Sequence, residues 1–263
     1  MTDQSHRKFY NTQDMGLGRA LADMGHCVDM YSFIKGDTDE TVEFAENLHM
    51  HYLHSKSFGF HSLHSCDFIT SDVDGVIVFS DNQMNFKQVR KVCQKNHVVC
   101  LPYIGALGSH NTSSLKKMLL DILIPNIRYY RKMTVMAKTP NVKKQMESEQ
   151  IKDVIVAPCC LDLAAVHEDY EKEDVGKLRE EIGFKENQKV ILFLARLIDE
   201  KHPLEMLDIF AELSKKDDSY RLISIGKGEL QPEFEKKMDD LGLRDKVYRI
   251  ESIENSQVWK FYR

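Results

Sequence analysis

The sequence predicts an α/β protein with mainly parallel sheets, divided into two domains. Stretches of strand and helix character alternate through most of the 263 residues, which is typical of βαβ units. A strongly charged run, residues 168–188, interrupts this alternation. We therefore expect two Rossmann-like domains, at residues 1–167 and 189–263, joined by a charged linker and helix at 168–188.

Composition excludes several classes of function. With 42% hydrophobic and 29% charged residues and a net charge of −5, the chain resembles an ordinary soluble protein and lacks the basic excess of a nucleic-acid binder. No apolar run approaches the roughly 18 residues that span a bilayer, and the N-terminus is polar. We expect a cytoplasmic protein whose six cysteines are reduced.

Periodicity predicts the elements of the first domain in order. Apolar residues at helical spacing predict a helix over 13–24, and Gly25-His26 ends it before a strand. Thr139 and Pro140 are suited to begin another helix, as N-cap and first residue. The predicted strands are 27–33, 48–53, 75–79, 98–104, 133–137 and 154–157, and the predicted helices are 13–24, 86–95, 140–149 and 175–182.

The segment 114–132 is helical in character, and Pro125 should kink or divide it. It interleaves lysine and arginine with leucine, isoleucine and methionine. Such a helix suits an anionic membrane surface. Alternatively, its apolar side covers the sheet, which is the interpretation that we favour.

The C-terminal third places cations and glycines after two neighbouring strands. Strand 190–194 leads into Arg196 and Lys201, and the next strand ends at Gly226-Lys227-Gly228. In open α/β sheets, ligands bind at the carboxyl ends of the strands, and arginine and lysine beside a glycine turn suit a phosphate or diphosphate. The absence of a third glycine argues against a dinucleotide fingerprint.

The run ILFLARLIDEKHPLEMLDIFAEL followed by YRLISIGKGELQPEFEKKMDDLGLRDKVYRI resembles the donor-binding domain of the group 1 glycosyltransferases, retaining enzymes of GT-B architecture. The resemblance implies that Arg196 and Lys201 hold the diphosphate of a nucleotide sugar and stabilise the leaving phosphate, as fixed cations can. It also implies that Gly226, Lys227 and Gly228 approach the nucleotide, and that strand 247–251, which ends at Glu251, lies near the base.

The first half resembles the acceptor domain of the same family. The segments that carry the resemblance are 9–26, with Gly16 in its helix, 76–83, 137–140 and 156–162. The resemblance implies acceptor contacts from Gly16, Asp81 and His61, and a catalytic contact of His110 with the donor sugar. Asp81 is equally suited to cap the following helix.

The sequence departs from the family at three glycine positions and at both ends. Ala195, His202 and Cys160 replace family glycines, and Cys160 would be strained if its backbone needed positive φ. The usual opening strand is missing, only three strands fit after residue 188, and the family's Glu-x7-Glu segment would lie beyond Arg263. We therefore expect a fragment of a longer protein.

A histidine-rich stretch is the densest candidate for a metal site. Its members are His49, His51, His54, His61, His64 and Cys66. The stretch lacks a closed Cys/His spacing and spreads over strand and loop, so we expect no metal and no cofactor. A metal-dependent hydrolase is accordingly the last of three functional hypotheses.

The leading hypothesis is a metal-independent glycosyltransferase. It would transfer a sugar, with retention, from a nucleotide-diphosphate sugar to a hydroxyl of a glycan or lipid-linked acceptor, in polysaccharide or glycolipid synthesis. The resemblance implies that the leaving phosphate helps to deprotonate the acceptor. Peripheral contact with the inner membrane face would suit a lipid acceptor. The second hypothesis is an inactive remnant that binds nucleotides or a partner.

Overall fold

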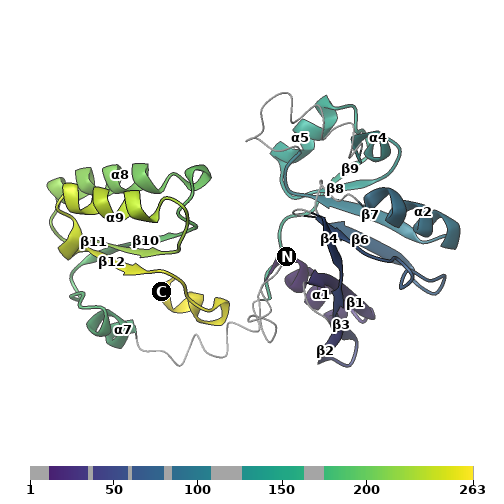
Figure 1. The fold of residues 1–263 in the computed structure, drawn as a ribbon, viewed down its shortest axis with the longest axis horizontal. Helices are drawn as coiled ribbons and strands as arrows, with labels where there is room; N and C mark the ends of the chain where they lie inside the picture. The colour runs from purple at the N-terminus through teal and green to yellow at the C-terminus, as the bar shows by residue number, and fades with distance from the viewer. Residues whose placement is uncertain are drawn as a thin grey trace. The chain divides into compact units, whose positions relative to one another are not determined.

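The computed structural model describes residues 12–34, 38–58, 61–79, 85–107, 126–162 and 175–262 of the chain. It divides into two compact units, Met1–Asp162 and Leu163–Arg263 (Figure 1). The division falls five residues before the boundary expected from charge, and the segment 175–188 belongs to the second unit. Each unit is described by itself below.

The first unit is built around a four-stranded parallel sheet. Its strands run in the order β6-β7-β8-β9, with helices α2, α4 and α5 in the connections (Figure 1). The bounds are β6 Gly75–Phe79, α2 Phe86–Asn96, β7 Val99–Ile104, α4 Asn126–Tyr130, β8 Val135–Ala137, α5 Pro140–Ser148 and β9 Val154–Val156. Thr139 caps α5 as predicted, because its hydroxyl accepts the Val142 N–H at 3.2 Å.

The other strands of this unit form separate sheets. Strand β1 (Val28–Ile34) pairs in parallel with β3 (Leu48–His54), and β3 pairs antiparallel with β2 (Glu40–Ala45). Two short strands, β4 (Lys56–Phe58) and β5 (His61–Leu63), form a hairpin. Among the described residues no strand joins β1 to β6, which is where the usual doubly wound order places the opening strand.

Helix α1 (Gln13–Asp23) packs against the segment that follows β9. A Cβ on Gly16 would lie 2.6 Å from the main chain of Cys160 and of Leu161. One turn along the helix, Arg19 pairs at 3.3 Å with Asp162, which is 5% exposed. Gly16 and Arg19 therefore fix the first helix to the end of the unit.

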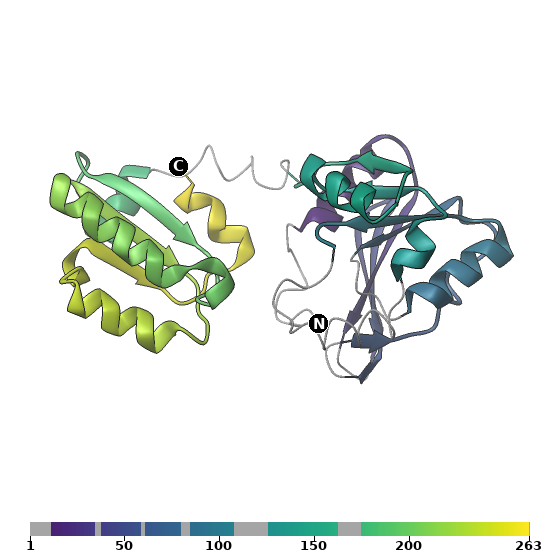
Figure 2. The same cartoon turned by 90° about the horizontal axis from the view of Figure 1, so that it is seen from above.

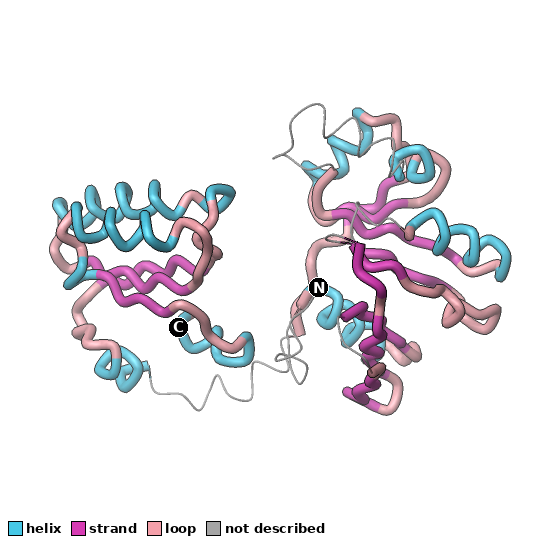
Figure 3. Tube along the Cα trace, viewed as in Figure 1, coloured by secondary structure: helices cyan, strands magenta, loops and turns pink. Residues whose placement is uncertain are grey.

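The second unit is a three-stranded parallel sheet, β10-β11-β12, with helices in both connections (Figure 2). Helices α8 and α9 cover one face of the sheet (Figure 3). On that face Phe210 and Phe234 pack against Leu222. On the other face, Phe184 packs against Ile223 and Ile225. The bounds are α7 Val175–Glu181, β10 Lys189–Leu194, α8 Pro203–Lys216, β11 Tyr220–Ile225, α9 Gln231–Asp240, β12 Val247–Ile250 and the 3₁₀ helix Asn255–Phe261.

Candidate functional site: the carboxyl edge of the second sheet

Three strand ends meet at one edge of the second sheet. The chain leaves β10 at Ala195 and β11 at Gly226, and main-chain hydrogen bonds join these turns to their neighbours. The Ala195 N–H donates to the Ile225 carbonyl at 3.0 Å, and the Gly226 N–H donates to the Ile250 carbonyl at 2.9 Å. The three turns therefore begin side by side, as the parallel order requires.

The Gly226-Lys227-Gly228 turn lies directly on the segment that carries Arg196. A Cβ on Gly226 would lie 1.9 Å from the Ala195 carbonyl oxygen, and one on Gly228 would lie 2.2 Å from the Leu197 carbonyl oxygen. Gly226 also has φ +142°, a conformation that side chains disfavour. Both glycines are therefore required by close backbone approach, and Leu197 N–H binds the Lys227 carbonyl at 3.1 Å.

The two predicted cations at this edge, Arg196 and Lys201, differ in whether their side chains already have a partner. The Arg196 side chain is exposed and forms no hydrogen bond or ion pair with another described residue. Lys201 instead donates to the Glu200 carboxylate at 2.8 Å. That hydrogen bond, together with the charges of Lys201 and Arg196, lowers the pKa of Glu200. Arg196 is thus available to an anion, whereas Lys201 would exchange a carboxylate partner for it.

Two helices begin at the same edge without a side-chain cap. Helix α8 has His202 as its N-cap and α9 has Leu230, and neither side chain accepts a main-chain N–H. The first N–H groups of a helix lack intrahelical partners and carry partial positive charge. Pro203 and Pro232 have no N–H, and the Gln231 N–H donates to the Gly228 carbonyl at 3.1 Å. These helix starts therefore contribute mainly the partial positive charge of their dipoles, which favours a phosphate at this edge.

The backbone strain that the sequence suggests for Cys160 is found at His202 instead. Cys160 does not have positive φ, so its replacement of a family glycine causes no such strain. His202 has φ +50°, in the left-handed region. A side chain with a Cβ is disfavoured there, which explains why a glycine follows the lysine in the family pattern.

Glu251 lies just beyond β12, at the same edge. Its carboxylate is exposed and accepts a hydrogen bond from the Gln231 side chain at 2.7 Å. Gln231 is the first residue of α9, so this contact links the end of β12 to the start of the helix. The other carboxylate oxygen of Glu251 can accept a hydrogen bond from a hydroxyl group. This suits the contact with the sugar donor that is predicted for Glu251.

The predicted acceptor residues are not gathered by the described part of the first unit. Gly16 lies in α1 and packs against the main chain of Cys160 and Leu161. His61 lies in β5, with a side chain outside the description, and Asp81 and His110 fall outside the described residues. Their roles remain predictions.

The histidine stretch is partly described. His49 and His51 lie on one face of β3, and both approach the Asp29 carboxylate, at 3.4 Å and 2.8 Å. No group that could hold a metal ion occurs within the described ranges. All six cysteines lie in those ranges and are free thiols.

Sequence reasoning missed one buried charge at the edge. Arg249 occupies an inward position of β12 with 12% of its side chain exposed. The alternation in Val247-Tyr248-Arg249-Ile250 contained the signal, because Arg249 shares the parity of Val247, which is in the core.

Comparison with known proteins finds a family that is similar to the second unit. Residues 174–263 match the model of the family described as glycosyl transferases group 1. Over these residues the second unit is similar to the group 1 glycosyl transferases. The recognition made from Arg196, Lys201 and the glycine turn is therefore confirmed for this unit.

A curated relative matches the chain over part of its length. The alpha-monoglucosyldiacylglycerol synthase of Streptococcus pneumoniae is 26% identical over 109 residues, which are 41% of this chain and 25% of the synthase. The aligned part of the chain thus spans about a quarter of that relative.

Solved structures extend the likeness to the first unit. Sucrose-phosphate synthase from Thermosynechococcus elongatus covers 94% of this chain with a TM-score of 0.66 at 12% identity, and the match spans 65% of that protein. TarM of S. aureus, in a complex with fondaparinux, alpha-GlcNAc-glycerol and UDP, matches 73% of this chain and 35% of its own, with a TM-score of 0.50 at 14% identity. These likenesses show the fold, so the prediction of Rossmann-like units of GT-B type is confirmed.

Proposed function

We propose that this chain carries the donor site of a retaining glycosyltransferase that uses a nucleotide-diphosphate sugar. The observation that carries the proposal is the exposed Arg196 side chain, which has no hydrogen-bond or ion-pair partner within the described residues, beside a turn whose close backbone contacts only glycine permits. Two uncapped helix starts lie at the same edge. The family of the second unit and the UDP named in the TarM complex support a nucleotide sugar as the ligand.

In this proposal, Arg196 and Lys201 act by electrostatic stabilisation. Breaking the bond between sugar and phosphate builds negative charge on the leaving diphosphate, and cations fixed nearby lower that barrier. Because two side chains and two helix starts supply this positive charge, we propose a metal-independent reaction. The leaving phosphate would accept the proton of the acceptor hydroxyl.

We further propose that the acceptor is a lipid-linked or glycan hydroxyl held by the first unit. The pneumococcal relative is named for a diacylglycerol product, which supports a glycolipid acceptor. Gly16, Asp81, His61 and His110 remain the proposed contacts of the first unit with acceptor and donor sugar. Because a lipid-linked acceptor lies at a membrane surface, we also propose peripheral contact with a lipid surface. No helix within the described ranges is long and apolar enough to cross a membrane.

The test is a transfer assay with diacylglycerol and glycosyldiacylglycerol acceptors in mixed micelles. UDP-, GDP- and ADP-sugars are supplied in turn, with and without EDTA, and release of the nucleoside diphosphate is measured. We expect one donor to be used, with EDTA without effect and the product retaining the donor configuration by NMR. Activity should be lost in Arg196→Ala/Lys201→Ala but kept in Arg221→Ala/Lys215→Ala, a charge-matched pair away from this edge.

The alternative of a binding remnant is favoured by one contact. Lys201 is already held by Glu200 at 2.8 Å, which partly neutralises the site before a donor arrives. The same assay separates the two functions, because a remnant would bind a nucleotide and release none from its sugar. Inversion of configuration, or loss of activity with EDTA, would contradict the mechanism proposed above.

A further inference from the structure

Arg249 is a largely buried cation, 12% exposed, that contacts the glycine turn. It lies opposite Ser224 in the register of β11 and β12, on the face that α9 covers. Its guanidinium carbon lies 5.2 Å from the centroid of the Phe234 ring. Arginine is seldom buried unless each of its donors has a partner, so the partners of Arg249 indicate what it does.

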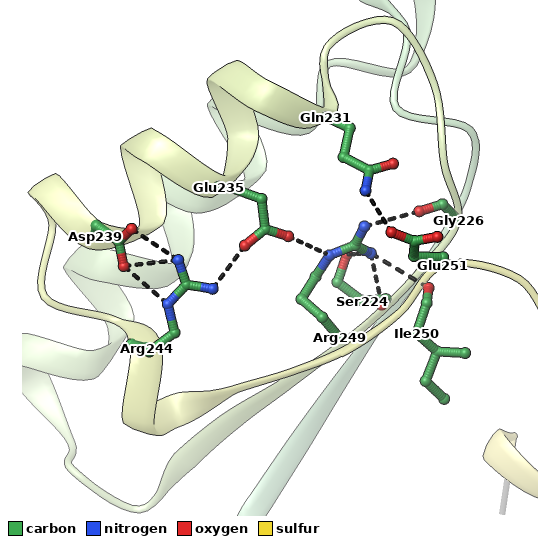
Figure 4. A network of polar contacts seen from close by, with 9 residues as sticks. All are labelled: Ser224, Gly226, Gln231, Glu235, Asp239, Arg244, Arg249, Ile250 and Glu251. Carbon is green, nitrogen blue, oxygen red and sulfur yellow. Dashed lines mark hydrogen bonds and ion pairs between the residues drawn. The ribbon is translucent and has the colours of Figure 1, made fainter.

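Most of those partners are main-chain carbonyls at the carboxyl edge (Figure 4). Nη2 donates to the Gly226 carbonyl at 2.9 Å, and Nη1 donates to the Ser224 carbonyl at 2.9 Å. Nη1 also lies 3.2 Å from the Ser224 hydroxyl and 3.4 Å from the Ile250 carbonyl. The rigid fork of the guanidinium thus connects the end of β11 with the first residue of the turn.

A chain of charges on α9 and the turn after it holds the guanidinium. Nε of Arg249 pairs with one Glu235 oxygen at 3.3 Å, and the other oxygen pairs with Arg244 at 2.6 Å. Arg244 in turn binds both oxygens of Asp239, at 2.8 Å and 2.7 Å. Arg244 contacts no atom of the glycine turn among the described residues, which makes it a matched control for Arg249.

The two hydrogen bonds of Gly226 fix the orientation of the next peptide. Its N–H is held by Ile250 and its carbonyl by Arg249. In a trans peptide the carbonyl and the following N–H point in opposite directions, so the Lys227 N–H is directed away from Arg249. Lys227 is exposed, and its N–H donates to no other described residue.

We propose that Arg249 is a positioning residue that keeps the Lys227 N–H turned outward as a donor to the nucleotide diphosphate. The inference rests on the proposed function for its ligand. The orientation of the Gly226–Lys227 peptide is a property of the chain itself and does not depend on a bound ligand. Without the fork, the Gly226 carbonyl loses its partner and the Gly226–Lys227 peptide can tilt, because ψ of a glycine is weakly restrained.

The test compares three variants of the full chain: Arg249→Met, Arg249→Lys and the control Arg244→Met. Backbone ¹H–¹⁵N spectra without ligand report the turn, and calorimetry with UDP, GDP and ADP reports binding. In Arg249→Met we expect shifted or broadened resonances of residues 226–228 and an affinity about tenfold weaker, as loss of one charge-assisted hydrogen bond predicts. Arg249→Lys, which keeps the charge without the fork, should rescue folding and leave affinity reduced.

The outcomes separate the two proposals. If the unaltered chain binds no nucleotide, the proposed function fails, and the spectra alone decide the role of Arg249. Unchanged resonances at 226–228 in a folded Arg249 variant overturn the inference, as does unchanged affinity. Equal losses in Arg244→Met also overturn it, since they would show a general effect of the charge chain. If Arg249→Met does not fold, Arg249→Lys carries the same comparison.

Discussion

The two edges of the second sheet use their charges differently. At the amino edge, Lys189 pairs with Asp217 at 2.8 Å, and Lys246 pairs with Asp218 at 2.5 Å. Arg221 donates to two main-chain carbonyls there, at 2.8 Å each. At the carboxyl edge, Arg196 and the Lys227 side chain have no such partner within the described residues.

The charged side chains at the amino edge are occupied by partners within the protein, whereas those of Arg196 and Lys227 at the carboxyl edge can pair with a ligand. Exposed ion pairs contribute little to stability individually, so the main effect of the pairs at the amino edge is to neutralise the charges of Lys189 and Lys246. An edge that combines an unpaired arginine, tight glycines and uncapped helix starts is instead suited to bind an anion.

The largest effect is expected for Gly226→Ala. The added Cβ would overlap the Ala195 carbonyl at 1.9 Å in a backbone with φ +142°. We expect a loss of at least about 3 kcal/mol in unfolding free energy, measured by urea denaturation. Gly242→Ala is the control, because Gly242 has φ +64° with nothing within 4 Å of the Cβ. A cost of about 1 kcal/mol is expected there, and equal costs would contradict the close approach.

The second prediction concerns acid. Hydrogen bonds from Lys189 and Ser219 hold the pKa of Asp217 well below its ordinary value. A depressed carboxyl pKa adds stability that is present above the unfolded value, near 3.9, and is lost as pH falls through the folded value. We expect Asp217→Asn to lower the melting temperature by a few degrees at pH 7, with the difference shrinking toward pH 2. A difference independent of pH would contradict this origin.

The smallest effect is expected for His202→Gly. His202 has φ +50°, which costs a residue with a Cβ about 1 kcal/mol relative to glycine. The melting temperature should rise by a few degrees. Part of this gain is offset because glycine increases the conformational entropy of the unfolded chain. His202→Ala retains the Cβ and should bring no gain. A gain equal to that of glycine would assign the effect to the imidazole instead.

The sequence predicted most of the second unit because its signals are local. An apolar run that ends in glycine and cations specifies a strand and its turn, and the three strands lie within a residue or two of their predicted limits. The pairing of Lys201 with Glu200 was not predictable, since it depends on side-chain rotamers. The burial of Arg249 was missed because an arginine in a strand usually faces water.

In the first unit the predictions were less complete. Strand β2 was missed, since Glu40–Ala45 alternates weakly and pairs antiparallel where a parallel sheet was expected. The missing opening strand stays a prediction, because residues 1–11 lie outside the described ranges. The acceptor contacts depend on residues such as Asp81 and His110, which lie outside the described ranges.

The central claim is that the carboxyl edge of the β10-β11-β12 sheet binds the diphosphate of a nucleotide. Its most direct test is calorimetry of UDP, GDP and ADP with Arg196→Ala and Arg221→Ala, arginines at opposite edges of one sheet. We expect one nucleotide to bind the unaltered chain, with affinity at least tenfold weaker in Arg196→Ala, as loss of a charged hydrogen bond predicts, and unchanged in Arg221→Ala. Equal affinity in the unaltered chain and Arg196→Ala would contradict the account.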